Sequence, residues 1–222
     1  MKKRFINKKT AKGVSIIGGA DGPTSIFIAG RTKKPGIRER IKRALYEKKR
    51  KQMETIITAD PHTLEEVIAY LQRRYDVIEL SEESREYEEQ KKSLRQSLII
   101  KHKPELLGDL AEMKQPEEYN EESLKALWNQ IELQSQRANE ISEELFPINF
   151  HIYRWELPSG GRIEFEIETI WKVFGTSYSG GKKEMKQLER ISKEAYLYYG
   201  VSQEDIENCT ERYSALLTIL CR

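Results

Sequence analysis

An alternating stretch in the third quarter of the chain most constrains the fold. Over residues 162–170, isoleucine and phenylalanine alternate with Glu164, Glu166 and Glu168, which is the period of a β-strand with one buried and one wet face. A second strand-like run, residues 149–157, precedes it, and a Pro-Ser-Gly-Gly turn separates the two. The sequence therefore predicts a β-hairpin whose three glutamates lie in water.

Most of the remaining sequence has helical periodicity. Thr63 and Glu66 form a capping box in front of an amphipathic run that reaches residue 75. Ser81 is a candidate cap for the next helix, which extends to about His102, and Pro147 ends another helix. The helix that Pro147 ends covers residues 121–145, and the other predicted helices cover residues 37–53, 182–199 and 203–221.

Short β-branched runs predict strands among the helices of the N-terminal half. Residues 55–58 and 77–80 flank the capped helix, and such a crossover normally gives two parallel strands. Residues 14–17 and 24–28 flank a glycine loop and are interpreted as a pair of strands. A helix beginning at Pro23 is the alternative.

These elements predict a helix-rich α+β protein with a small N-terminal mixed sheet (strand-helix-strand) and a C-terminal β-hairpin packed with helices. We divide it into a basic entry segment with the glycine loop, a basic helix followed by the strand-helix-strand-helix region, and a region of helix, hairpin and two final helices. These three regions are residues 1–35, 36–115 and 116–222. A glycine-rich loop is expected over residues 175–181.

Charge is divided unevenly along the chain. The formal net charge is +2, but residues 1–51 hold 17 Lys and Arg against three acids, a net +14, which leaves −12 for the rest. A basic arm of this kind binds nucleic acid, an anionic membrane surface or an acidic protein, or it docks on its own acidic body. The candidate anion-binding residues are Arg38, Arg40, Lys42, Arg43, Lys48, Lys49 and Arg50.

Cysteine spacing and hydropathy bear on the compartment. Cys209 and Cys221 lie 12 residues apart on one predicted helix, so they could not form a disulfide without breaking it. Reduced thiols favour a cytoplasmic location. No uncharged apolar run approaches the ~18 residues of a transmembrane helix, so no membrane insertion is expected. The glycine loop also interrupts the N-terminal apolar run, which argues against an export signal.

The segment IGGADGPTSIF, residues 17–27, resembles the signature of the β subunit of sodium ion-translocating decarboxylases. In that family the signature aspartate lies at a broken membrane helix and takes part in sodium and proton handling, which by resemblance implies Asp21. The rest of the chain lacks the spans that a pump needs, so we expect neither pumping nor decarboxylation. From the residues alone, the loop is either a tight turn or a ligand loop. Its candidate ligand-binding residues are Gly18, Gly19, Asp21, Gly22 and Thr24.

Catalytic candidates are few. Arg95 and His102 have the spacing seen in helical ribonucleases of the HEPN type, although it arises easily by chance and both residues fall near a helix C-terminus, where cations are favoured. The histidines and cysteines lack the spacing of a zinc site, so neither a metal nor a cofactor is expected. The C-terminal tyrosines and tryptophans are mostly core, and a few could serve a protein interface or a homo-oligomer.

These observations favour a non-enzymatic adaptor or regulatory protein that binds a protein partner or an anionic ligand through its basic N-terminus and glycine loop. A nucleic-acid-binding protein, or a ribonuclease that uses Arg95 and His102, is the first alternative. An accessory protein related to sodium-pumping decarboxylases is the second, and it depends on the signature alone.

Overall fold

The computed structural model describes residues 13–19, 22–29, 36–112, 116 and 120–221. The chain forms two compact units, each discontinuous in sequence. We call Pro35–Ser81 with Asn149–Arg222 the sheet unit, and Met1–Lys34 with Glu82–Ile148 the helical unit. This division differs from the three consecutive regions proposed from the sequence.

The sheet unit contains a four-stranded antiparallel sheet of order β3-β4-β5-β6. Its strands are β3 (Ile78–Glu79), β4 (Phe150–Glu156), β5 (Arg162–Glu168) and β6 (Val173–Ser179). The predicted hairpin is confirmed, with Tyr153 opposite Phe165 across β4 and β5. Together with the helices, this sheet confirms the α+β class.

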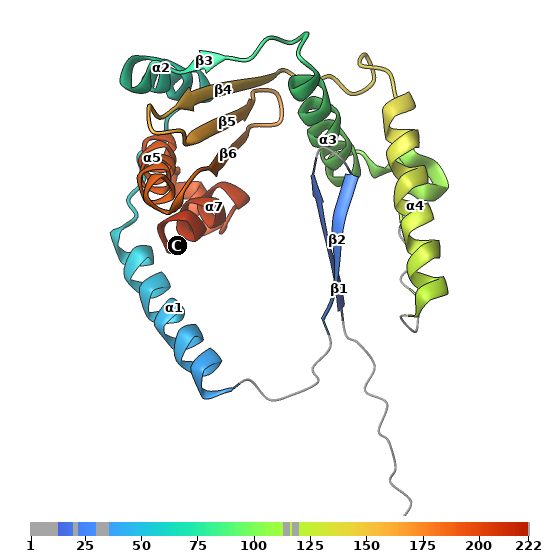
Figure 1. Ribbon diagram of the computed structural model, residues 1–222, viewed down its shortest axis with the longest axis horizontal. Helices are drawn as coiled ribbons and strands as arrows, with labels where there is room; N and C mark the ends of the chain where they lie inside the picture. The colour runs from blue at the N-terminus through green and yellow to red at the C-terminus, as the bar shows by residue number, and fades with distance from the viewer. Residues whose placement is uncertain (1–12, 20–21, 30–35, 113–115, 117–119, 222) are drawn as a thin grey trace, which may run out of the picture. The chain divides into compact units, whose positions relative to one another are not determined.

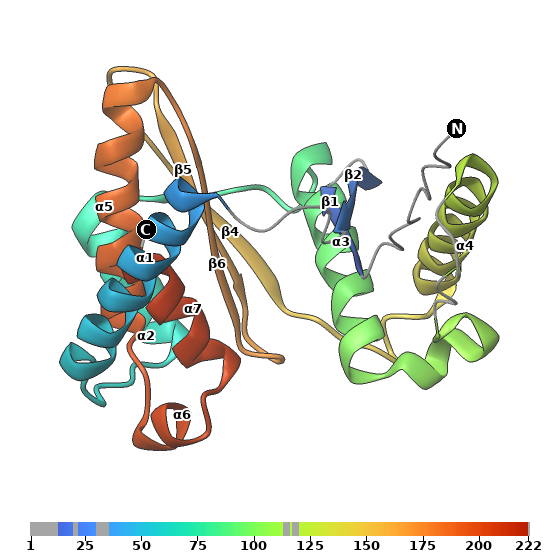
Figure 2. The same ribbon diagram turned by 90° about the horizontal axis from the view of Figure 1, so that it is seen from below.

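Helices cover one face of this sheet. Figure 2 shows α2 (Leu64–Tyr75), α5 (Lys182–Tyr199) and α7 (Glu211–Cys221) on the same side of the strands. The buried side chains of that face, including Phe165 and Ile167, join one hydrophobic core with the inner faces of the three helices. Burial of apolar surface stabilises a folded protein by about 25 cal/mol per Å² removed from water. The packing of this face against the helices therefore stabilises the sheet unit.

The Arg212 side chain, near the start of α7, joins three segments of the core. Its Nε donates to the carbonyl of Gly200 (2.8 Å), and its Nη2 donates to the carbonyls of His62 (2.8 Å) and Tyr199. The guanidinium also lies over the Tyr199 ring, 3.6 Å from its centroid. One charged group therefore ties the loop before α2, the end of α5 and α7 together.

Gly200 makes the same junction possible through its backbone. It ends α5 with φ +61°, and a Cβ at this position would lie 1.9 Å from the carbonyl oxygen of Asp60. The neighbouring amides of Asp60 and His62 donate to the carbonyls of Val201 and Tyr199, 3.0 Å each. Only glycine combines this conformation with so close an approach.

The predicted strand at residues 55–58 is wrong. α1 (Ile37–Ile56) continues through its first two residues, and Ile57 is the C-cap. Met53 and Ile57 are one helical turn apart and pack against the core, so tertiary contact overrides the β-propensity of the Thr-Ile-Ile-Thr run. The parallel crossover is wrong as well, because β3 pairs antiparallel with β4.

Two C-terminal predictions also need correction. The predicted glycine-rich loop is largely β6, an edge strand in which Gly175 lies opposite Glu166, since glycine is tolerated at a sheet edge. The predicted final helix is two helices, α6 (Gln203–Glu207) and α7, interrupted where Cys209 has φ +49°. Cys209 and Cys221 are free thiols, as predicted.

The glutamates of β5 do not form a wet face. Glu164 is 5% exposed and Glu168 is fully buried. Glu164 accepts a 2.8 Å hydrogen bond from Nε of Arg154, which lies opposite it on β4. Glu168 accepts from the backbone amides of Asn149, Ile170 and Trp171 and so fixes the turn after β5. Both carboxylates have partners, which makes their burial tolerable.

The helical unit has its own elements. Figure 1 shows α3 (Arg85–His102), the short 3-10 segment η1 (Pro104–Leu110) and α4 (Glu121–Glu140). α4 ends five residues before the predicted boundary. β1 (Gly13–Gly19) and β2 (Gly22–Ala29) pair antiparallel, which confirms the interpretation as two strands and excludes a helix beginning at Pro23.

We predict that Arg212→Lys destabilises the sheet unit by about 2 kcal/mol, because an ammonium cannot reach three carbonyls at once. Urea unfolding followed by circular dichroism measures this. Arg190→Lys is the matched control, since Arg190 forms an exposed pair with Glu194, and it should cost less than about 0.5 kcal/mol. Equal losses in the two variants would contradict the anchoring role of Arg212.

We also predict a pH-dependent effect of Glu166→Gln. Burial, and next the charge of Glu164, raises the pKa of the Glu166 carboxyl. The folded chain therefore binds this proton more tightly than the unfolded chain, and ionisation weakens folding as the pH rises above about 4.3. Glu166→Gln should be more stable than wild type at pH 7, and the gain should vanish below about pH 4. The exposed Glu156→Gln serves as control in thermal melts, and a gain that is independent of pH would contradict this account.

Candidate interaction surface

The predicted anion-binding residues all lie on α1. The helix begins after Gly36, whose backbone amide donates to the Glu39 carboxylate at 3.1 Å. Its 20 residues include eight Lys and Arg and three Glu, a net +5. Figure 1 shows the N-terminal turns of α1 lying away from α7 and from the sheet, so this charge is presented to solvent.

α1 has two apolar faces with different surroundings. Met53 and Ile57 pack against the core of the sheet unit. Ile37, Ile41 and Leu45, spaced four residues apart, remain 76%, 55% and 62% exposed. At 100° per residue these three point about 140° away from the packed face. They form a separate stripe, which we call the α1 stripe, that the fold of the sheet unit does not use.

Cations border the α1 stripe. On the helical wheel, Arg38 and Lys42 lie on one side of it, Arg40 lies on the other, and Lys48 lies within its line. Arg43 and Arg50 instead form i,i+4 pairs with Glu47 and Glu54 at 3.0 and 2.9 Å. Among the residues that the structure describes, the four bordering cations have no ion-pair partner. The geometry therefore combines apolar contact with unneutralised positive charge.

The structure describes only part of the glycine loop. Gly18, Gly19, Gly22 and Thr24 belong to β1 and β2, where Gly19 pairs with Gly22 and the register shifts after Ile17. Asp21 lies outside the described residues. The loop and α1 belong to different compact units. A ligand-binding role for the loop, and its resemblance to the decarboxylase signature, both stay predictions.

Arg95 is a structural residue of the helical unit. It is 8% exposed, and its guanidinium donates to the carbonyls of Ala138, Ile141, Ser142 and Phe146 at 2.8–3.2 Å. These carbonyls come from the end of α4 and the segment after it, so Arg95 caps that helix. Burial lowers the pKa of Arg95, yet a guanidinium keeps its proton.

His102 lies two turns further along α3 and is exposed. The structure thus places the two residues of the ribonuclease hypothesis on nearly the same side of one helix, about 10.5 Å apart along its axis. Four of the five guanidinium N–H groups of Arg95 are already used on backbone carbonyls. This engagement gives Arg95 a role that does not require a scissile phosphate.

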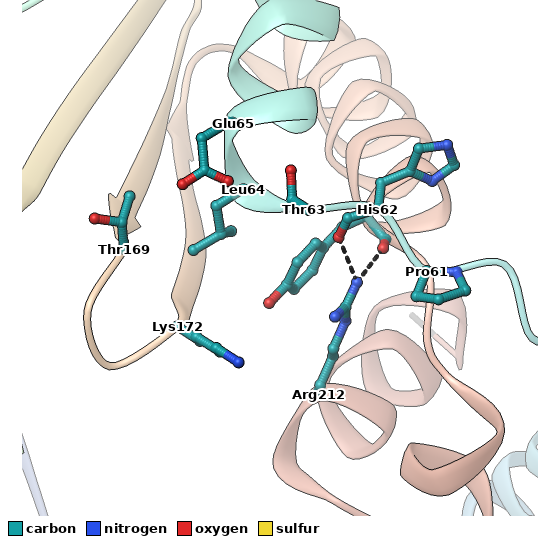
Figure 3. Close-up of a pocket in the computed structure, with 9 residues that line it drawn as sticks. Pro61, His62, Thr63, Leu64, Glu65, Thr169, Lys172 and Arg212 are labelled. Carbon is teal, nitrogen blue, oxygen red and sulfur yellow. Dashed lines mark hydrogen bonds between the residues drawn. The ribbon is translucent and has the colours of Figure 1, made fainter.

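Sequence reasoning did not single out Lys172 and Arg212, and it considered Tyr199 only as one of the C-terminal aromatic residues. We group these three residues here. They come from the β5–β6 turn, the end of α5 and the start of α7, and they line a cavity in the sheet unit together with residues 61–65 and Thr169 (Figure 3). No motif joins them, because the positions converge only in three dimensions. The one available signal is that Lys172 and Arg212 are positively charged and lie in a turn and near the start of a helix.

Comparisons with protein-family models, with curated proteins and with solved structures give no match to this chain. Within the described residues, no three His, Cys, Asp or Glu side chains gather in a way that could hold a metal ion. In the same residues, no helix is both long enough and apolar enough to span a bilayer.

We predict that Arg95→Lys destabilises the helical unit by about 3 kcal/mol, because it leaves several carbonyls at the end of α4 without a donor. His102→Ala, at an exposed position, should cost less than about 1 kcal/mol. Thermal unfolding followed by circular dichroism measures both. If Arg95→Lys were as stable as His102→Ala, the capping role would be wrong and the catalytic hypothesis would gain weight.

Proposed function

We propose that this protein is a non-enzymatic cytoplasmic adaptor that binds an acidic protein partner through the N-terminal half of α1. The observation that carries the proposal is the α1 stripe with its border of cations. Three large aliphatic side chains at i, i+4 and i+8 are the anchors that a helix places in an apolar groove. Free thiols at Cys209 and Cys221 support a reducing compartment.

Exposure of the stripe supports an interaction surface. Apolar patches rimmed by polar groups mark sites of protein or membrane contact more often than isolated exposed residues do. The stripe lies on a different face from Met53 and Ile57, so it is not the edge of the existing core. Seating an isoleucine in a partner's groove would contribute about 1.5–3 kcal/mol.

The same pattern favours a protein over a nucleic acid. Phosphate binding needs only cations, and it would leave Ile37, Ile41 and Leu45 in water. A groove bordered by carboxylates satisfies both the apolar stripe and the cations beside it. A membrane is a weaker fit, because the stripe holds no Trp or Phe and α1 carries three glutamates.

The test uses Ile41→Glu, with Ile78→Glu as the matched control. Ile78 is 74% exposed and lies on β3, away from α1 in sequence. Tagged protein is offered nuclease-treated cytoplasmic extract, single-stranded RNA and phosphatidylserine vesicles separately. We expect one acidic protein to be retained in a saturable manner, with affinity reduced about tenfold or more by Ile41→Glu and unchanged by Ile78→Glu.

Charge-reversal variants provide a second part of the binding test. Arg38→Glu with Lys42→Glu should weaken the same interaction and reduce its salt dependence, whereas reversal of the exposed Lys183 and Lys186 on α5 should not. Binding to RNA that Ile41→Glu leaves intact would overturn the proposal in favour of a nucleic-acid-binding protein. Binding to vesicles alone would overturn it in favour of a membrane-surface role.

A further inference from the structure

The cavity of Figure 3 lies in the sheet unit, and none of its lining residues belongs to α1. Its volume is about 350 Å³, which lies within the usual range of ligand pockets. Four segments contribute to it: the loop and first turn of α2, the β5–β6 turn, the end of α5 and the start of α7. Arg212 and Gly200 hold three of these segments together, so the walls are part of the folded core.

Tyr199 supplies a hydroxyl donor to the cavity. The residue is 6% exposed and lines the cavity, yet its hydroxyl has no hydrogen-bond partner among the described residues. A tyrosine hydroxyl that has no protein partner is available to donate to a bound group. Burial is the main cause that raises the pKa of Tyr199, against the lowering effect of Arg212. The hydroxyl therefore keeps its proton and can donate it.

Two cations border the same space. Figure 3 shows the Lys172 side chain extending from the β5–β6 turn into the space beside Leu64, and Arg212 approaching from α7. The two Nη1 hydrogens of Arg212 and the ammonium of Lys172 have no acceptor among the described residues. Lys172 has φ +57°, in a turn whose amides are held by the buried Glu168 carboxylate. These contacts set the position of the Lys172 backbone, and its side chain is exposed.

The N-terminus of α2 adds backbone donors. Thr63 caps this 12-residue helix by accepting from the amide of Glu66. The amides of Leu64 and Glu65, both at the cavity, are first-turn donors that the helix cannot satisfy. They add the positive end of the helix dipole to the two cations.

Among the described residues that line the cavity, Glu65 is the one acid, and its carboxylate faces the Thr169 side in Figure 3. Behind the lining, the charge of Asp205 acts on Arg212 and Tyr199. We propose that the cavity binds the phosphate group of a small phosphorylated metabolite. The phosphate would accept from Lys172, Arg212, Tyr199 and the first-turn amides of α2. A hydroxyl or amine elsewhere on the metabolite would donate to Glu65, and the cavity volume leaves room for it.

The test is a titration of the full chain with inorganic phosphate at constant ionic strength, followed by ¹H–¹⁵N NMR. We expect saturable shifts of the amides of Leu64, Glu65 and Lys172, and none when chloride replaces phosphate. Lys172→Asn removes the charge while tolerating the left-handed backbone, and it should weaken phosphate binding about tenfold. Tyr199→Phe, which keeps the ring beneath Arg212, should weaken it several-fold.

Lys183→Asn, an exposed lysine on α5, is the control for net charge and should leave the titration unchanged. Retention of the wild-type spectrum outside the cavity establishes that each variant is folded. The absence of saturable shifts in the wild type would overturn the proposal. Equal weakening in Lys172→Asn and Lys183→Asn would also overturn it, because it would show only nonspecific charge screening.

Discussion

The Arg212 guanidinium is the contact on which the sheet unit depends. Its three donated hydrogen bonds connect the loop before α2 to the end of α5 from the first turn of α7. The backbone pairing of Asp60 and His62 with Val201 and Tyr199 runs beside it, and Gly200 allows the close approach. The guanidinium thereby joins segments that lie about 140 residues apart in the sequence. This contact fixes how the helices pack against the sheet.

This junction has consequences for both proposed sites. It places Tyr199 and Arg212 at one cavity with the first turn of α2, so the donors for a phosphate are pre-organised rather than assembled on binding. It also fixes α7, against which the C-terminal half of α1 packs. With that half anchored, the α1 stripe is held on the opposite side of the helix and stays available to a partner.

How much could be read from the sequence depended on whether the signal was local. The capping box at Thr63, the hairpin turn before Gly161 and the α+β class follow from local pattern, and the structure confirms them. The 55–58 run failed because contact of Met53 and Ile57 with the core outweighed β-propensity.

The glutamates of β5 show the same limit at the level of burial. Strand alternation predicts which side chains share a face, but it does not tell whether that face is covered or which partners are present. In the structure Glu164 is buried and accepts a hydrogen bond from Arg154 opposite it, and Glu168 accepts hydrogen bonds from backbone amides near the turn after β5. Of the candidate sites, the basic residues of α1 were predictable from composition. The cavity was not, because Lys172, Tyr199 and Arg212 converge only through the fold.

The central claim is that the α1 stripe contacts a protein partner, and site-specific photo-crosslinking in living cells tests it most directly. A photoreactive amino acid would replace Ile41 in one strain and Ile78, exposed on β3, in another. The account predicts one discrete protein adduct from position 41 that position 78 does not form. Identical adducts from both positions, or crosslinks from position 41 to RNA or lipid alone, would contradict it.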